Sequence, residues 1–535
     1  MIASPCPETP TDIPCRIAWT DAEIAEALQH LSHPLSVIRE RSSGRMGLSI
    51  DTPPTSVPAG CEAVALLPPL EPARLGDPKF LLAHGVRYPY IAGEMATGIA
   101  TADMVIAMAY AGMLGFFGAG GLAPHVIQVA LERIRNELEP QGLPWGVNLI
   151  HNIQDPTAED QVVDMLLHHR VGRVCASAYL QLTPAVVRYA CKGLRRDQEG
   201  RIVRPQQLIA KLSRPEIARR FASPAPEAIL SSLVGSGHLT AQEAELAAHI
   251  PLAQDITVES DSGGHTDNRP LGALFPTIAQ AVRQTQILHG YSEPIRLGAA
   301  GGLGEPQSVA AAFALGAAYV VTGSINQAAV ESGLSSAGRA LLAQAAIEDV
   351  AMAPAADMFE LGVKVQVLKR GTMFSVRAQR LYDAYRKYPA IDAIPGPERQ
   401  RMESEMFRAP LDEIWQQTKA FFTERNPAEI DRASRDPKHR MALVFRWYLG
   451  QASRWATQGV PDRILDYQIW CGPAMGAFND WTRGSFLADP GERTVVQIAK
   501  NLLEGAAAVT RAHQLRSLGV PIPASAFDFR PRRLR

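Results

Sequence analysis

The stretch from residue 256 to residue 270 constrains the fold more than any other part of the sequence. It begins with Ile256, Thr257 and Val258, a β-branched run that reads as a buried strand, and Gly263 and Gly264 then end the strand in a tight turn. The next five residues, 265–269, include no apolar side chain. Parallel barrels present their chemistry at the carboxyl ends of such strands. The stretch therefore predicts one barrel strand with a polar rim.

The same pattern recurs twice downstream, where residues 295–302 end in Gly301 and Gly302 and residues 318–324 end in Gly323 and Ser324. Backbone N–H groups can approach an oxyanion only where side chains are absent, and the last two turns of a barrel commonly hold a phosphate. A helix opened by Pro306 and another starting at Ser324 would add partial positive charge. A single glycine pair would indicate only a tight turn, whereas two in succession predict a phosphate site.

Strand and helix signals alternate along the first two thirds of the chain. The predicted strands cover residues 88–95, 113–119, 144–150, 173–178, 207–212, 255–260, 295–299 and 318–322. Eight βα units over roughly 240 residues fit a TIM barrel. A doubly wound sheet is the alternative, but its glycine-rich turn follows the first strand, whereas the turns here cluster after the late strands.

The pattern divides the chain into four segments. Residues 1–60 are rich in proline and poorly patterned, apart from a helix near residues 21–31 with Thr20 as N-cap and a linker at 51–60. Residues 61–330 form the predicted barrel, with a helical insertion at about 213–254. Residues 331–520 show helical periodicity, and 521–535 read as a basic, frayed tail. The predicted fold class is α/β, a TIM barrel with a helical insertion and a C-terminal mainly helical domain.

Charge and cysteine content exclude several functions. A net charge of −1 gives no overall attraction to nucleic acid or anionic membranes. None of the six cysteines belongs to a CxxC pair or a zinc-like spacing, which indicates free thiols in a reducing compartment. The N-terminus lacks the features of a signal peptide, and no stretch of about twenty residues is apolar enough to span a bilayer. The sequence thus predicts a cytoplasmic protein with no metal site and with neither nucleic-acid nor membrane partners.

Three polar residues at predicted strand ends are candidates for chemistry. His265 suits a site that donates a hydrogen bond or a proton near neutral pH, and the alternative is a rim histidine bonded to Asp261 or Asp267. Asn148 closes the third strand and either contacts a planar ring or caps the strand. Lys211 closes the fifth strand and is either a cofactor contact or an exposed end-of-strand lysine.

At these positions the chain resembles the nitronate monooxygenase (2-nitropropane dioxygenase-like) superfamily. The motifs that carry the resemblance are residues 259–266, 298–302 and 321–324. The C-terminal extension carries three more, at residues 357–372, 441–450 and 466–476, which resemble the PfaD-type trans-acting enoyl reductases of polyunsaturated fatty acid and polyketide synthases. The resemblance covers about residues 80–520 and gives no support for the first sixty.

The resemblance implies a TIM barrel that seats FMN at its mouth, and NADPH or NADH as the electron source. The absence of a GxGxxG motif opening a βαβ unit also favours FMN over a dinucleotide flavin. His265 matches the histidine placed near the flavin, where it would protonate the α-carbon, polarise the thioester carbonyl or orient the ring. The implied phosphate and ring contacts, together with the candidates that the turns and strand ends add, are Gly93, Glu94, Met95, Asn148, Lys211, Gly264, Gly301, Gly302, Gly323 and Ser324.

The implied activity is reduction of α,β-unsaturated acyl thioesters carried on an acyl carrier protein, in trans with polyketide or fatty acid synthase modules. A homodimer is one option for the assembly. A nitronate monooxygenase is the first alternative, but a small free substrate needs no helical docking surface. A redox-silent docking scaffold is the second, and the intact glycine pairs and His265 argue against it.

A basic run at residues 364–387 predicts where the carrier protein docks, since carrier proteins are generally acidic around their phosphopantetheine serine. Arg377 and Arg380 fall on one side of a predicted helix over residues 375–387. The alternative is a solvated helix face. Residues 470–481 are either a helix-packing turn or a lid facing the barrel mouth.

Overall fold

The computed structural model describes residues 17–50, 57–151 and 156–534. The chain divides into two compact units, one made of residues Met1–Leu75 with Leu502–Arg530 and the other of Gly76–Asn501 with Pro531–Arg535. The first boundary therefore lies fifteen residues beyond the predicted one at residue 60. Most of the predicted linker, residues 51–56, lies outside the described residues.

The larger unit contains a closed barrel of eight parallel strands, which confirms the predicted TIM barrel. Around the barrel the strands follow the order β11-β12-β14-β15-β5-β6-β7-β8. All eight predicted strands are present, with bounds within a few residues of those expected: β5 (Tyr90–Ala92), β6 (Leu114–Phe117), β7 (Gly146–Ile150), β8 (Arg173–Ser177), β11 (Gln207–Leu212), β12 (Asp255–Glu259), β14 (Arg296–Ala300) and β15 (Tyr319–Thr322).

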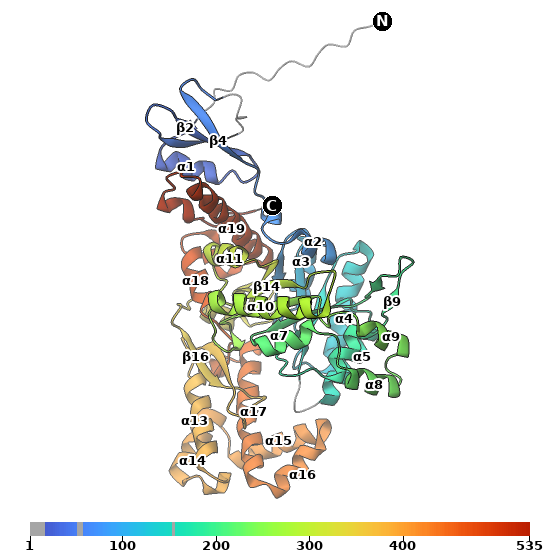
Figure 1. Cartoon of the computed structure of the whole chain (residues 1–535). Helices are drawn as coiled ribbons and strands as arrows, with labels where there is room; N and C mark the ends of the chain where they lie inside the picture. The colour runs from blue at the N-terminus through green and yellow to red at the C-terminus, as the bar shows by residue number, and fades with distance from the viewer. Residues whose placement is uncertain (1–16, 51–56, 152–155, 535) are drawn as a thin grey trace. The chain divides into compact units, whose positions relative to one another are not determined.

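Helices connect successive strands and surround the barrel (Figure 1). Several begin where the sequence supplies a cap, as at Thr101 and Thr183, whose side chains accept from backbone N–H groups of the first turn. Helix α2 (Pro78–His84) precedes the first barrel strand, and the connecting helices are α3 (Ala102–Tyr110), α4 (Pro124–Leu138), α5 (Pro156–His168), α6 (Pro184–Cys191), α7 (Pro215–Ala222), α10 (Leu271–His289) and α11 (Pro306–Ala314). The predicted insertion contains α7 and two further helices, α8 (Glu227–Gly235) and α9 (Ala241–Ala247).

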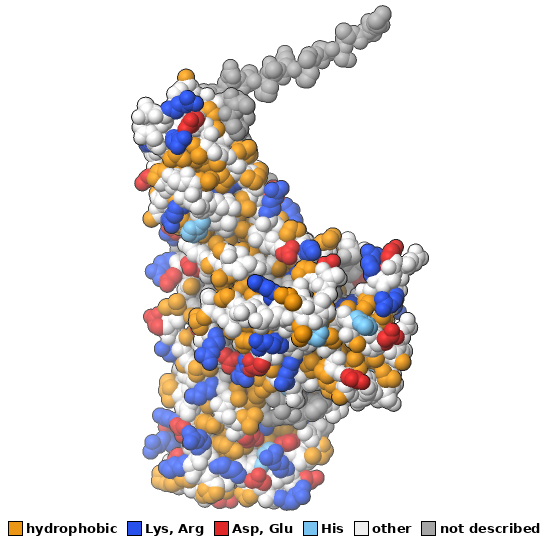
Figure 2. Space-filling view, viewed as in Figure 1, with side chains coloured by type: hydrophobic (Ala, Val, Ile, Leu, Met, Phe, Trp, Pro, Cys, Tyr) orange, Lys and Arg blue, Asp and Glu red, His pale blue; other side chains and the backbone are white. Residues whose placement is uncertain are grey.

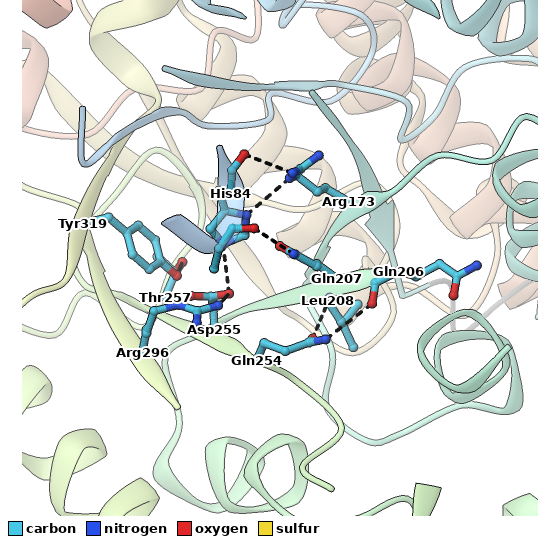
Figure 3. Close-up of polar contacts among 11 residues, drawn as sticks. His84, Arg173, Gln206, Gln207, Leu208, Gln254, Asp255, Thr257, Arg296 and Tyr319 are labelled. Atoms are coloured by element: carbon cyan, nitrogen blue, oxygen red, sulfur yellow. Dashed lines mark hydrogen bonds and ion pairs between the residues drawn. The ribbon is translucent and has the colours of Figure 1, made fainter. Parts of the chain in front are cut away.

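A buried polar cluster closes the barrel at the amino ends of its strands (Figure 3). Asp255, fully buried, accepts from the Arg296 guanidinium at 2.6 and 2.7 Å and from His84 Nε2 at 3.1 Å. Arg173 Nε donates to His84 Nδ1 at 3.3 Å, which fixes His84 as the neutral Nε2–H tautomer. Burial lowers the pKa of His84. Burial alone would raise the pKa of Asp255, but His84 and Arg296 outweigh it and lower that pKa.

We expect Asp255→Ala to lower the free energy of unfolding by about 3–5 kcal/mol, because Arg296, whose side chain is only 14% exposed, would be left without its carboxylate. Asp103→Ala is the matched control, since its ion pair with Arg133 is more than half exposed and its loss costs about 1 kcal/mol or less. Urea unfolding of both variants measures the difference. Equal small effects would contradict a structural role for the cluster.

Because the pKa values of His84 and Asp255 are both lowered by folding, the cluster's stabilisation is present at neutral pH and lost on acidification.

The C-terminal extension of the larger unit is mainly helical, as predicted, but it begins with a small sheet that the sequence did not indicate. Strands β16 (Val350–Pro354) and β17 (Lys364–Leu368) form a hairpin, and β13 (Gly264–His265) from the barrel rim pairs antiparallel with β17. Five residues per strand give little periodicity, and the third strand is supplied by a segment about 100 residues away. The helices of the extension and its flanks are α12 (Ser336–Leu342), α13 (Phe374–Lys387), α14 (Gly396–Met402), α15 (Leu411–Arg425), α16 (Pro427–Arg435), α17 (Pro437–Gln458), α18 (Ala474–Thr482) and α19 (Val495–Ser517).

The smaller unit has more regular structure than the sequence suggested. The predicted helix is present as α1 (Asp21–Leu28), with Thr20 and Glu23 in a capping box. The residues predicted to be poorly patterned contain β1 (Ile17–Ala18), β2 (Leu35–Glu40) and β3 (Met46–Ile50). These strands form an antiparallel sheet of order β1-β3-β2-β4 with β4 (Cys61–Leu67), a segment that the sequence assigned to the barrel. The alternation was not visible because β2 is buried on both faces at Leu35–Ile38.

The C-terminal segment contributes to the core of the same unit. Arg511 is buried and donates to the carbonyls of His30, Leu31, His33 and Pro68. Val520 and Ala526 pack in the core of this unit, and Phe529 is 2% exposed. The expectation of a frayed tail is therefore wrong, because apolar residues that precede its arginines are packed.

Surface charge is mixed. On the face shown in Figure 2, acidic and basic side chains are interspersed. None of the helices in the described parts of the chain is long and apolar enough to cross a membrane.

Candidate active site

A cavity of about 1060 Å³ opens at the carboxyl ends of the barrel strands. Its lining includes every residue predicted for the site, namely Gly93, Glu94, Met95, Asn148, Lys211, Gly264, His265, Gly301, Gly302, Gly323 and Ser324. Residues of the helical extension line the same cavity. The structure thus brings the predicted positions together from the ends of β5, β7, β11, β12, β14 and β15 and the turns that follow them.

The glycines after β14 and β15 leave open space in the lining. Gly301 (φ +85°) and Gly302 (φ +69°) both adopt left-handed backbone conformations. A Cβ on Gly301 would lie 2.7 Å from the Ser260 backbone, so this glycine is required by the fold. A Cβ on Gly302 or Gly323 would have no atom within 4 Å. Those two positions therefore form an open cradle rather than a packed turn.

The segment after the extension's long helix lies against this cradle. Ser324 opens a five-residue 3-10 helix, and its hydroxyl accepts from the Gly472 N–H at 3.1 Å. A Cβ on Gly263 would come within 2.8 Å of the Cys471 nitrogen. Trp470 lines the cavity. The sequence leaves two alternatives for residues 470–481, a helix-packing turn and a lid that faces the barrel mouth. Residues 470–472 combine both, because they pack against the barrel rim and Trp470 lines the cavity.

Lys211 lies at the cavity floor between two carboxylates. Its Nζ is 3.0 Å from Glu259 Oε1 and 3.1 Å from Glu94 Oε1, and its side chain is 17% exposed. Burial alone would lower the pKa of Lys211, but Glu259 and Glu94 outweigh it and raise that pKa, so the ammonium stays charged. The alternative of an exposed end-of-strand lysine is wrong. Cys175 donates to the same Glu94 oxygen at 3.3 Å, and burial raises its pKa well above the ordinary value.

Three buried acceptors in the lining have no hydrogen-bond partner in the described parts of the chain. They are Glu94 Oε2, Gln327 Oε1 and Asn148 Oδ1, and the Nδ2 of Asn148 donates to Ser177 Oγ at 2.9 Å. Unpaired buried acceptors are costly, so they indicate a ligand that brings N–H donors. Together with the open cradle and the Lys211 ammonium, they fit a planar ring with N–H groups joined to a phosphate, which is the composition of FMN.

His265 is paired with a carboxylate from the extension. Its Nε2 lies 3.0 Å from Asp357 Oδ2, and the β13–β17 pairing brings the two together. Burial alone would lower the pKa of His265, but the hydrogen bond and charge of Asp357 outweigh it and raise that pKa. The partners expected from the sequence are engaged elsewhere: Asp267 pairs with Arg214, and Asp261 accepts from Asn268 and Gln366.

Only part of the basic run at residues 364–387, the predicted docking site, is free to contact a partner. Helix α13 is present, but Arg377 is 14% exposed and ion-paired to the fully buried Asp466. Arg380 lies 3.6 Å from Glu405. The two arginines therefore do not form the free basic pair that the spacing suggested. Among the described residues there is also no group of three or more His, Cys, Asp or Glu side chains placed to hold a metal ion.

Comparisons with known proteins agree with this site. The family model described as nitronate monooxygenase matches residues 79–377, and that of the inserted helical domain of [acyl-carrier-protein] S-malonyltransferase matches residues 388–467. A component of the polyunsaturated fatty acid synthase of Thraustochytrium sp. is 45% identical over 498 residues, covering 92% of this chain and 33% of the relative. Polyketide biosynthesis protein PksE of Bacillus subtilis is 43% identical over 429 residues, covering 80% and 55%. The chain thus spans about a third to a half of these relatives.

A solved structure matches over nearly its whole length. The enoyl reductase domain of MlnA, from the macrolactin biosynthesis cluster of Bacillus amyloliquefaciens, superposes with a TM-score of 0.79 at 36% identity, covering 83% of this chain and 99% of that domain. The barrel and the helical extension are therefore shared features rather than peculiarities of one sequence. The chain belongs to the nitronate monooxygenase family of flavin-dependent oxidoreductases, in the branch that includes the enoyl reductase domain of MlnA.

Proposed function

We propose that this chain is an enoyl reductase that reduces α,β-unsaturated acyl thioesters on an acyl carrier protein, in trans with polyketide or fatty acid synthase modules. Its resident cofactor would be FMN and its co-substrate NADPH or NADH. The observation that carries the proposal is one cavity lined by both the barrel rim and the helical extension. At about 1060 Å³ it exceeds the usual size of a single small-molecule site, so a cofactor and a thioester fit together.

Separate groups of cavity residues would bind the cofactor and act on the substrate. Gly302, Gly323 and Ser324 would hold the phosphate, and Glu94 and Asn148 would accept from the ring N–H groups. Bound FMN, once reduced, supplies the hydride that reaches the β-carbon of the enoyl thioester. Lys211 keeps a positive charge at the cavity floor, where negative charge on a ring would be stabilised.

His265 is placed to manage the proton that accompanies the hydride. With Nε2 bonded to Asp357, Nδ1 is the ring nitrogen left for the substrate. Because Asp357 favours the imidazolium, His265 can hold a proton at Nδ1 near neutral pH and give it to the α-carbon or share it with the thioester carbonyl. Asp357 acts through His265 and is a positioning residue.

We expect Asp357→Asn to lower the pKa of His265, because burial would then act without the carboxylate that opposes it. A group with a raised pKa loses its proton as pH rises, so the fall in rate at high pH should move to lower pH in the variant. The measurement is the pH profile of flavin oxidation by an enoyl thioester in stopped flow. Asp357→Glu should restore most of the wild-type profile, and an unchanged profile in Asp357→Asn would remove Asp357 from the mechanism.

Nitronate monooxygenase activity is the second candidate, because the matching family model bears that description. Oxygen consumption with an alkyl nitronate, compared with NADPH consumption with an enoyl thioester, separates the two. The proposal requires the second activity and fails if only the first is found.

A further inference from the structure

The cavity continues beyond the barrel rim along two helices of the extension. Thr418, Phe421 and Arg425 line it from α15, and Trp447 and Arg454 line it from α17. Residues three, four and seven positions apart share one face of a helix, so each helix turns a single face toward the cavity. Helices α15 and α17 pack against each other and lie together in the lower part of Figure 1. None of the residues assigned above to the cofactor belongs to these two helices.

Carboxylates in the cavity lining are all engaged. Glu94, Glu259 and Asp357 take part in the pairs described above, and so does Asp267. Glu429 accepts from His439 Nε2 at 2.7 Å. Glu159 accepts from the Tyr179 hydroxyl at 2.8 Å. Each acidic side chain of the lining is therefore bonded within the chain, Glu159 to neutral hydroxyls and the others to a cation or a histidine.

Several cations of the lining are not compensated in this way. Lys364, Arg425 and Arg454 are exposed and have no ion pair with any carboxylate in the described parts of the chain. The Arg425 guanidinium stacks over Phe421 with its carbon 4.4 Å from the ring centroid, which holds the side chain against the helix. The extension thus carries surplus positive charge at the edge of a cavity that also contains aromatic side chains.

We propose that Arg425 and Arg454 form an anion subsite for the phosphate of a phosphopantetheine thioester, with Lys364 adding positive charge. The inference rests on the proposed function and extends it to substrate recognition. A phosphopantetheine arm joins one phosphate to a long, uncharged chain that ends in the thioester. A guanidinium group donates two parallel hydrogen bonds to two oxygens of one phosphate. The part of the cavity between these arginines and His265 would accept the uncharged chain. The same arm occurs on carrier proteins and in coenzyme A, and the subsite would bind the phosphate that both contain.

Binding is the direct test, because it does not depend on turnover. Titration calorimetry of the purified flavin-containing protein would use S-butyryl-phosphopantetheine and S-butyryl-pantetheine, saturated analogues that differ only in the phosphate. We expect the wild type to bind the phosphorylated analogue about 10- to 100-fold more tightly, and Arg425→Gln with Arg454→Gln to abolish that preference. Arg283→Gln, on an exposed face of α10 away from the cavity, is the control and should keep it.

Equal affinity of the wild type for the two analogues, or an undiminished preference in the double variant, would overturn the subsite. Flavin content, read from the absorbance spectrum, checks that the barrel of each variant is intact.

Kinetics with the corresponding crotonyl thioesters separates this inference from the proposed function. If the wild type reduces neither thioester yet binds the phosphorylated analogue more tightly, the proposed function fails and the subsite stands. If it reduces both with the same kcat/KM and the double variant behaves identically, the enzyme stands and the subsite fails. Crotonyl-coenzyme A and a crotonyl carrier protein, compared in the wild type and the double variant, then identify which source of the arm the subsite serves.

Discussion

Replacing His265 by alanine is expected to leave FMN bound and to slow reduction of an enoyl thioester by about 10²–10⁴-fold, the usual contribution of a positioned acid or hydrogen-bond donor. The side chain lies in the cavity lining, and its Nε2 is committed to Asp357 at 3.0 Å. Alanine removes the ring nitrogen that would face the substrate. The cofactor cradle at Gly302 and Gly323 does not include His265, so flavin content should be preserved.

Stopped flow separates the half-reactions. Flavin reduction by NADPH should be little changed in His265→Ala, and flavin oxidation by the enoyl thioester should be slow. His249→Ala removes an exposed histidine outside the cavity and serves as the control. If His265→Ala oxidises its flavin at the wild-type rate, His265 has only a structural role. That result would favour the alternative in which His265 is a rim histidine bonded to a carboxylate.

Replacing Gly302 by valine is expected to abolish flavin retention without unfolding the barrel. Gly302 has φ +69°, where a β-branched residue is strained, and the added side chain would occupy the open cradle. Flavin released by heat from the wild type should be FMN by chromatography, and the variant should release almost none.

Gly290 is a matched control, because it also has a left-handed φ of +66° and open space around it but caps helix α10 away from the cavity. Gly290→Val should cost a similar amount of backbone strain, about 1–3 kcal/mol, and keep its flavin. Loss of flavin from both variants would show that Gly302 acts through stability alone. Gly301 is not a suitable probe, because a Cβ there meets the Ser260 backbone and would disturb the fold itself.

The barrel was predictable because its signals are local. Each strand is a short apolar run ended by glycine or a polar residue, and eight of them in succession leave few topologies. The glycine pairs were predictable for the same reason, since a left-handed turn at Gly301 and Gly302 needs a residue without a side chain. Strand ends in a parallel barrel meet at one rim, so the candidate residues at those ends were expected to share one cavity.

What could not be predicted depends on contacts between distant segments. Asp357 lies 92 residues from His265, and nothing in either local pattern indicates the β13–β17 pairing that joins them. Glu259 belongs to a recognised motif, but its ion pair with Lys211 follows only from the barrel register. Arg377 illustrates the opposite error, because a helical spacing that suggests an exposed basic face cannot reveal the buried Asp466 beneath it.

The smaller unit shows a further limit of sequence patterns. Strand β2 is buried on both faces, so its residues do not alternate, and the core of this unit is completed by a C-terminal segment more than 400 residues away. Arg511 would be read as a surface residue of a long helix, yet it is buried and bonded to four backbone carbonyls. Such residues are recognised only once the chain ends are seen together.

The central claim is tested most directly by consumption of NADPH in the absence of oxygen. The purified yellow protein would be mixed with NADPH and a trans-2-enoyl thioester on an acyl carrier protein, with NADPH alone as the blank. The account predicts that one NADPH is oxidised for each enoyl chain converted to its saturated product, and little or none in the blank. NADPH oxidation that needs dioxygen and is indifferent to the thioester, with no saturated product formed, would contradict it.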